Sequence, residues 1–157
     1  MVNAPAPPNR TRDASTSGVR GVLEGLRIVI VDDDADARDL LATVLTQRSA
    51  RVFAADCAAE AFDLLARERP DLLISDIAMP EEDGYTLIGR VRALSADDGG
   101  RTPAIAVTAY AGRADRKRAL DAGFDAHFAK PIDIDALVVT LLDIRSTRDL
   151  HIDEKKP

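Results

Sequence analysis

The chain has few of the features that characterise secreted, disulfide-bonded or membrane-spanning proteins. Its 157 residues include one cysteine, no tryptophan, four phenylalanines and two tyrosines. A single cysteine excludes an internal disulfide and fits a reducing compartment. No apolar run approaches the ~18–20 residues of a membrane span, and the N-terminus lacks the apolar core of a signal peptide. We therefore expect a cytoplasmic protein that does not enter a membrane by itself, with one globular domain built from its 46% hydrophobic residues.

An excess of positive charge is also absent. The 21 Lys and Arg residues are outnumbered by 27 Asp and Glu residues, which leaves a net charge of −6. This balance disfavours binding to nucleic acid, which needs a basic surface. One basic concentration remains, and it alternates with acids and alanines: Arg113, Arg116, Lys117 and Arg118. The pattern is typical of a solvated helix face, and an acidic protein partner is the alternative.

The composition divides the chain into a central domain and two polar ends. Residues up to about Gly21 are rich in Pro, Ala, Ser, Thr, Asn and Arg, so they lack the apolar surface needed to order themselves. After Ile144 the chain is again short and polar. We expect a flexible linker or tail over 1–24, a folded domain over 25–146 and a polar C-terminal tail over 147–157.

Short apolar runs alternate with helical patterns through the central domain. This alternation predicts parallel strands with helices on both faces of one sheet. In the first helix, the expected apolar stripe is Leu40, Leu41, Val44 and Leu45. The expected strands are 27–31, 51–55, 71–75, 104–107 and 124–128, and the expected helices are about 35–48, 58–68, 85–94, 113–121 and 134–144.

Three of the apolar runs end at charged residues. The first runs into Asp32 and Asp33, the third into Asp76, and the last into Lys130. Ligands of open parallel sheets bind at the carboxyl ends of the strands, so these groups should converge. Three carboxylates with one ammonium are about two negative charges out of balance, which suits Mg²⁺. Taken alone, the run 32–34 would more often be a helix cap and a solvated acidic edge.

Taken together, five motifs carry a resemblance that covers the chain from about Leu26 to Ile144. This stretch resembles the receiver domain of two-component response regulators, most of all receivers at the C-terminal end of hybrid sensor histidine kinases. A standalone receiver is the alternative. The resemblance implies a flavodoxin-like, doubly wound, five-stranded parallel sheet with strand order 2-1-3-4-5. The motifs are Ile30–Asp34, Ser75–Pro80, Asp83-Gly84, Val107–Ala109 and Lys130-Pro131.

The resemblance also implies a role for each strand-end residue. Asp76 matches the phosphoacceptor, which takes a phosphoryl group from a histidine kinase or a histidine phosphotransfer domain. Asp33, Asp76 and the backbone carbonyl of Ala78 would bind Mg²⁺, for which Mn²⁺ could substitute, and Asp32 would act through metal-bound water. Thr108 and Lys130 match the residues that contact the phosphoryl oxygens. The Lys130–Pro131 peptide is typically cis in this family.

Three further positions are implied to switch or tune the site. Thr108 and His127 match the family's switch pair, although the family commonly has Tyr or Phe at the second position. A half-buried packing residue is the alternative interpretation of His127. Ala78 and Tyr110 match the positions that tune loss of the phosphoryl group, and a bulky Tyr110 would shield an acyl phosphate from water.

Other classes of protein fit the sequence less well. A phosphatase of the haloacid-dehalogenase type would use Asp32 and Asp34, but Asp36 replaces its expected Thr or Val and Asp76 would have no role. A degenerate receiver that only binds partners would not need the complete acid set. We expect a domain that is no enzyme beyond its own phosphorylation and dephosphorylation. The sequence leaves open a weak homodimer through the elements at 113–121, 124–128 and 134–144.

Overall fold

Strands and helices alternate along the whole domain. The computed structural model describes residues 21–110 and 112–155, with side chains up to residue 147. All the expected strands and helices form, and most of their ends lie within two residues of the predicted ones. The elements are η1 (Gly21–Leu23), β1 (Arg27–Val31), α2 (Ala35–Gln47), β2 (Arg51–Ala55), α3 (Ala58–Glu68), β3 (Leu72–Asp76), α4 (Gly84–Arg92), β4 (Ala104–Thr108), α5 (Arg113–Ala122), β5 (Ala126–Ala129) and α6 (Ile134–Lys155).

The strands form one parallel sheet in the order β2-β1-β3-β4-β5. This confirms the doubly wound, flavodoxin-like topology that the resemblance implied. The register pairs Val31 with Ser75, Asp76 with Val107, and Thr108 with Ala129. The carboxyl ends of four neighbouring strands therefore lie at the same level of the sheet.

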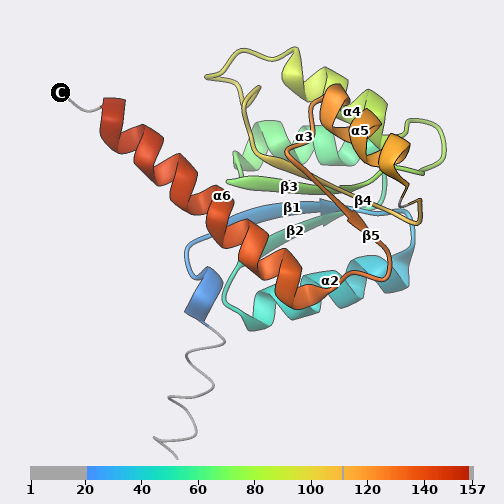
Figure 1. The fold of residues 1–157 in the computed structure, drawn as a ribbon, viewed down its shortest axis with the longest axis horizontal. Coiled ribbons are helices and arrows are strands. Elements are labelled where there is room, and N and C mark those ends of the chain that lie inside the picture. The colour runs from blue at the N-terminus through green and yellow to red at the C-terminus, as the bar shows by residue number, and fades with distance from the viewer. Residues whose placement is uncertain (1–20, 111, 156–157) are drawn as a thin grey trace, which may run out of the picture.

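Helices cover both faces of the sheet, as Figure 1 shows: α3, α4 and α5 lie on one side and α2 and α6 on the other. Alternate residues of each strand supply the two cores, because successive side chains point to opposite faces. In β1, Val29 and Val31 pack with the α3–α5 layer, whereas Ile28 and Ile30 pack with α2 and α6. β3 is buried along its whole length, as expected for a central strand covered on both faces.

One residue of the predicted apolar stripe on α2 is exposed. Leu41 and Leu45 are buried one helical turn apart, whereas the side chain of Leu40 is 65% exposed. Adjacent helical residues are rotated by about 100°. Leu40 therefore lies at the border of the stripe and projects from the protein surface.

The packed region begins earlier than the expected boundary at residue 25. Leu23 of η1 is completely buried in the core between α2 and α6, and its N–H donates to the carbonyl of Arg48 at 2.9 Å. Leu23, together with the partly buried Val22, thus extends the core, which composition alone does not reveal. Residues 1–20 of the predicted linker lie outside the described residues.

The last helix continues beyond the predicted end near Ile144. α6 runs to Lys155 and so includes most of the segment expected to be a polar tail. No glycine or proline interrupts residues 144–155, so the backbone hydrogen bonds can continue. The hydroxyl of Thr147 also donates to the carbonyl of Asp143 at 3.0 Å. Within residues 21–110 and 112–155, no helix is both long and apolar enough to cross a membrane.

The turn between β3 and α4 depends on a close backbone approach at Gly84. A Cβ atom there would lie 2.5 Å from the carbonyl oxygen of Asp76 and 2.9 Å from the Cα atom of Ile77. The N–H of Gly84 donates to the carbonyl of Ile77 at 2.8 Å, and the side chain of Asp83 caps α4. Only glycine fits this backbone without moving the strand end that carries Asp76.

Replacement of Gly84 by alanine should therefore destabilise the protein. We expect Gly84→Ala to lower the free energy of unfolding by about 1–3 kcal/mol, because the added methyl group overlaps backbone atoms that cannot move separately. Gly89→Ala is the matched control, since a Cβ at Gly89 meets nothing within 4 Å. That variant should gain up to about 1 kcal/mol from helix propensity. Urea unfolding measures both changes, and equal effects of the two substitutions would contradict the steric explanation.

Candidate functional site

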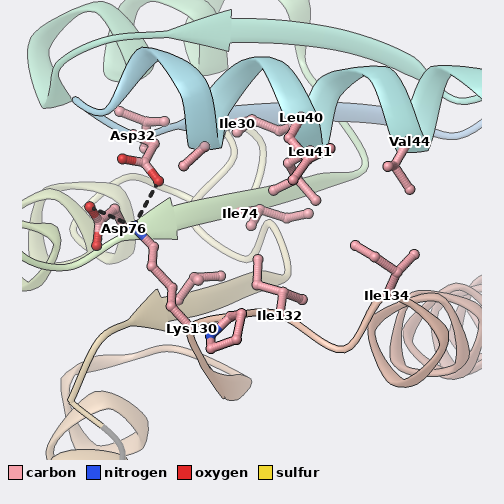
Figure 2. Close-up of a pocket in the computed structure, with 14 residues that line it drawn as sticks. Ile30, Asp32, Leu40, Leu41, Val44, Ile74, Asp76, Lys130, Ile132 and Ile134 are labelled. Carbon is pink, nitrogen blue, oxygen red and sulfur yellow. Dashed lines mark hydrogen bonds and ion pairs between the residues drawn. The ribbon is translucent and has the colours of Figure 1, made fainter.

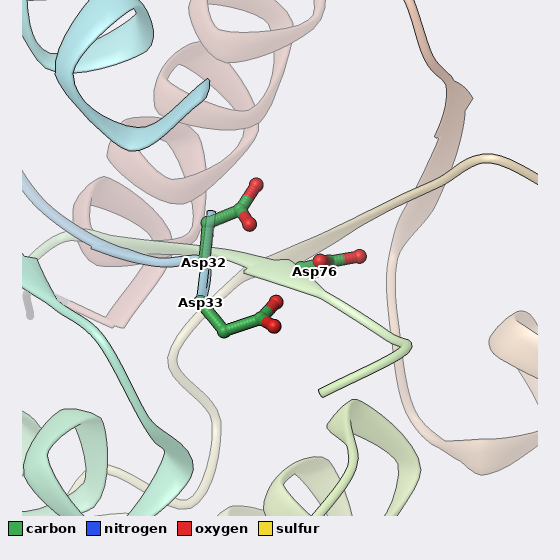
Figure 3. A group of neighbouring side chains, drawn as sticks. All are labelled: Asp32, Asp33 and Asp76. Carbon is green, nitrogen blue, oxygen red and sulfur yellow. The ribbon is translucent and has the colours of Figure 1, made fainter. Parts of the chain in front are cut away.

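The acids predicted at the strand ends lie together at the carboxyl edge of the sheet. Asp32 and Asp33 follow β1, and Asp76 ends the neighbouring strand β3, as Figure 3 shows. One carboxylate oxygen from each of the three residues lies within 4.8 Å of the other two. Asp32 and Asp76 are buried, with 7% and 6% exposure, whereas Asp33 is exposed. The cluster therefore has two acids held in the protein and one open to solvent.

Lys130 brings one positive charge to this cluster. Its Nζ atom lies 3.0 Å from Oδ2 of Asp32 and 3.3 Å from Oδ2 of Asp76. Figure 2 shows the lysine side chain reaching from the end of β5 toward both acids. The Lys130–Pro131 peptide is cis, which confirms that prediction. One ammonium beside three carboxylates leaves about two negative charges, so the oxygen ligands and the charge both fit a hard divalent cation.

The three acids of the run 32–34 have different local roles. The side chain of Asp34 caps α2 by accepting hydrogen bonds from the N–H groups of Asp36 and Ala37. The N–H of Asp34 in turn donates to Oδ1 of Asp32 at 2.9 Å, which orients that carboxylate. The capping interpretation is thus correct for Asp34, and it leaves Asp32 and Asp33 for the cluster.

Arg38 is a neighbour of the site that the sequence did not indicate. Its guanidinium Nη1 atom donates to the backbone carbonyl of Asp32 at 2.8 Å. The bond ties the first turns of α2 to the loop that carries Asp32. A long side chain near the beginning of a helix can fold back in this way. The position of Arg38 in the sequence does not distinguish it from an arginine that points into solvent.

Burial and charge change the protonation of the central pair. Desolvation, followed by the charge of Asp32, raises the pKa of Asp76 to about 6, against the opposing influence of Lys130. Burial acts to lower the pKa of Lys130, but its hydrogen bond to Asp32 and the charge of Asp76 outweigh burial, so its pKa is raised. Lys130 therefore remains charged, while Asp76 holds its proton more tightly than an exposed carboxyl group.

Thr108 lies at the same edge of the sheet. It ends β4 and is 1% exposed, and its hydroxyl oxygen accepts a hydrogen bond from the N–H of Tyr110 at 3.2 Å. The N–H of Lys130 donates to the carbonyl of Thr108 at 2.8 Å. These bonds connect the loop after β4 to the position of the lysine.

The other predicted positions lie on β5 or in the loops that follow β3 and β4. His127 is half-buried on β5, and its Nε2 atom is buried without a hydrogen-bond partner among the residues that the structure describes. Tyr110 follows Thr108 in the loop and is 64% exposed. Ala78, two residues after Asp76, is exposed. This edge of the sheet thus carries a charged cluster, the buried hydroxyl of Thr108 and, in the loop after β4, the exposed ring of Tyr110.

Comparisons with known proteins point to one family. A family model described as the response regulator receiver domain matches residues 28–142. An uncharacterised 14.6 kDa protein from the sodA1 3′ region of Leptolyngbya boryana is 52% identical over 111 residues, which are 71% of this chain and 83% of that protein.

Two longer relatives are kinases. The sensor histidine kinase RcsC of Escherichia coli K12 is 33% identical over 80% of this chain, and the match spans 13% of that protein. The hybrid signal transduction histidine kinase D of Dictyostelium discoideum is 29% identical over 87% of this chain and 9% of its own length. The chain therefore corresponds to a small part of each kinase.

Solved structures agree with the sequence matches. The N-terminal domain of an uncharacterised protein from Wolinella succinogenes has a TM-score of 0.71 and 30% identity, covering 81% of this chain and 99% of that one. The receiver domain of the Arabidopsis thaliana histidine kinase CKI1, complexed with Mg²⁺ and BeF₃⁻, has a TM-score of 0.70 and 27% identity. That match covers 83% of this chain and 97% of the receiver.

The raised pKa of Asp76 predicts a specific pH dependence of stability. Because the folded-state pKa exceeds the unfolded value of 3.8, stability that is fully present below pH 3.8 is lost as the pH rises through about 6. The Asp76→Asn variant has no carboxyl group at this position, so its unfolding free energy does not show this decrease with pH. Without divalent cations, the variant should gain about 2–3 kcal/mol in unfolding free energy over wild type between about pH 4 and pH 7.

Chemical denaturation of both proteins at each pH, in chelator, measures this difference. Asp63→Asn serves as the control, because Asp63 is exposed on α3. That variant should follow wild type at every pH. A constant difference between Asp76→Asn and wild type from pH 4 to pH 7 would contradict the assignment of the raised pKa to Asp76.

Proposed function

Because the chain belongs to the response regulator receiver domain family, we propose that it takes a phosphoryl group from a phosphohistidine onto Asp76 and signals by changing conformation. The observation that carries the proposal is the charge arrangement around Asp76. Its buried carboxylate lies in a cluster with Asp32 and Asp33 and 3.3 Å from the ammonium of Lys130. Such an arrangement provides a nucleophile together with groups that compensate the charge of an incoming phosphoryl group.

The proposed transfer needs little covalent chemistry from the protein. A carboxylate oxygen of Asp76 forms a P–O bond while the P–N bond of the donor's phosphohistidine breaks. The donor imidazole leaves with the electron pair of that bond and takes up a proton. Lys130 would move from pairing with Asp32 and Asp76 to pairing with a phosphoryl oxygen, and Thr108 would donate its hydroxyl to another oxygen.

The acid cluster would hold the cofactor. Asp32, Asp33 and Asp76 are the described carboxylates close enough to share one ion. Asp33, Asp76 and the backbone carbonyl of Ala78 would bind it directly, and Asp32 would act through metal-bound water. Bound Mg²⁺, or Mn²⁺ in its place, would compensate the negative charge that the phosphoryl group brings. The relative from Arabidopsis that was solved with Mg²⁺ and BeF₃⁻ supports the choice of metal.

Acetyl phosphate tests the acceptor and the metal together. With Mg²⁺, the protein should gain one phosphate on Asp76, as measured by intact mass and by peptide mapping. Asp76→Asn should gain none, and the exposed control Asp63→Asn should label like wild type. In chelator the cluster repels the phosphoryl group, so labelling should fall to background.

Two outcomes would contradict the proposal. Labelling at the same rate without metal would remove the proposed role of the cluster. Phosphate on Asp32 with continuing turnover would favour a phosphatase of the haloacid-dehalogenase type instead.

The proposed switch connects the site to the surface formed by α5, β5 and α6. When Thr108 turns toward the phosphoryl group, it would give up its bond to the N–H of Tyr110, and His127 would move toward the space that the hydroxyl leaves. The unsatisfied Nε2 atom of His127 supports this role, because a new position could provide the missing hydrogen bond. The imidazole NMR signals of His127 should therefore shift on phosphorylation, and unchanged signals would leave His127 as a packing residue. A weak homodimer would use the same surface.

Tyr110 is proposed to lengthen the life of the phosphorylated state. Its exposed ring lies in the loop beside the site and could screen an acyl phosphate on Asp76 from water. Tyr110→Ala should lose phosphate faster, by on the order of threefold. Leu120→Ala is the control, because Leu120 is also exposed but lies near the other end of α5. Equal or slower loss in Tyr110→Ala would contradict the shielding role.

The partner and the parent chain are also proposals. The donor would be a histidine kinase or a histidine phosphotransfer domain in the cytoplasm, and nucleic acid would not be a direct ligand. The kinase relatives are many times longer than the stretch they share with this chain. The domain would serve either as a receiver within a hybrid histidine kinase or as a standalone receiver that relays phosphate.

A further inference from the structure

An apolar cavity lies directly beside the acid cluster. It has a volume of about 280 Å³ and is bounded by the sheet, by α2 and by the segment that joins β5 to α6. Ile30 and Ile74 line it from the sheet, and Ala37 lines it from α2. Ile132 and Ile134 form the opposite wall, as Figure 2 shows. Aliphatic side chains therefore surround most of the space.

The end of the cavity nearest the strand termini is charged. Asp32, Asp76 and Lys130 line this end, and the two carboxylates and the ammonium are in contact there. The exposed side chain of Leu40 also lines the cavity and adds an apolar border where α2 faces solvent. The cavity thus joins an apolar interior to a negatively charged end.

The apolar interior and the charged end of the cavity each restrict which ligands can bind. An apolar cavity of ~150 Å³ in another protein stays dry and binds benzene, so the larger cavity here has room for an aromatic ring with a short side chain. The charged end has a net negative charge, because the two carboxylates of Asp32 and Asp76 outnumber the ammonium of Lys130. A cationic group is attracted to this end and an anionic group is repelled.

We propose that the cavity is a binding site for a small molecule with an apolar body and a single positive charge, such as an arylalkylamine. The apolar body would lie among the isoleucines, and the ammonium would pair with the carboxylates. A ligand in this position would stand next to Asp76 and so could control access to it. Binding itself needs neither metal nor phosphoryl transfer, so it can be tested independently of the proposed function.

The test uses 2-phenylethylamine as the probe and isoleucine methyl NMR as the measurement, with the whole chain in chelator. Titration should give saturable shifts of the methyl signals of Ile30, Ile74, Ile132 and Ile134, whereas Ile88, in the core on the other face of the sheet, should not shift. The anionic analogue 3-phenylpropionate should bind at least about fivefold more weakly. Equal affinity for the two probes would overturn the proposed preference for a cation.

A pair of alanine substitutions tests the location. Ala37→Leu fills the cavity and should weaken amine binding by at least about tenfold. Ala66→Leu adds the same atoms at an exposed position of α3, on the other side of the sheet, and should bind like wild type. Unchanged Ile88 signals show that each variant is folded. Three results would overturn the proposal: no saturable shifts, shifts that include Ile88, or equal effects of the two substitutions.

Discussion

The contact between Lys130 and the two buried acids, Asp32 and Asp76, requires the strands that carry them to be aligned in one sheet. Lys130 is 98 residues from Asp32 and 54 residues from Asp76 along the chain, yet its ammonium bonds to both. This is achieved because β1, β3 and β5 end at the same level of one sheet. A shift of one residue in any register would move a charged group to the other face. The register of the sheet is therefore inseparable from the chemistry at its edge.

The same contact leaves the site short of positive charge. Burial and then the charge of Asp32 raise the pKa of Asp76, and the single ammonium of Lys130 does not offset them. The folded domain must supply the energy that keeps this carboxylate in place, and it does so with apolar layers on both faces of the sheet. The stability of the core thus offsets the cost of holding negative charge at the strand ends. That excess of negative charge favours binding of a cation.

Much of the fold and of the site could be predicted from the sequence. Apolar runs that end in Asp32, Asp76 and Lys130 indicate buried parallel strands, and parallel strands bring their carboxyl ends together. The order of the strands could not be derived from those runs and came from the resemblance to a family. Separations of residues along the chain describe local periodicity, but the choice of neighbours in a sheet depends on packing between distant segments.

Details that depend on packing escaped the sequence. Leu40 belongs to an apolar run, yet it lies just beyond the buried stripe of α2. Leu23 closely follows a stretch of polar composition, yet it is fully buried. The Nε2 atom of His127, which has no partner among the described residues, and the bond from Arg38 to Asp32 both depend on how side chains pack around a strand end. No spacing rule carries that information.

The length of α6 has a geometric consequence for movements near the site. The helix begins at Ile134, four residues after Lys130, and its 22 residues extend to Lys155. At 1.5 Å per residue it is about 33 Å long. A rotation of only about 10° at its first turn would displace its far end by about 6 Å. An adjustment too small to disturb the sheet at Lys130 would thus become, at the other end of the helix, a displacement larger than the width of a side chain.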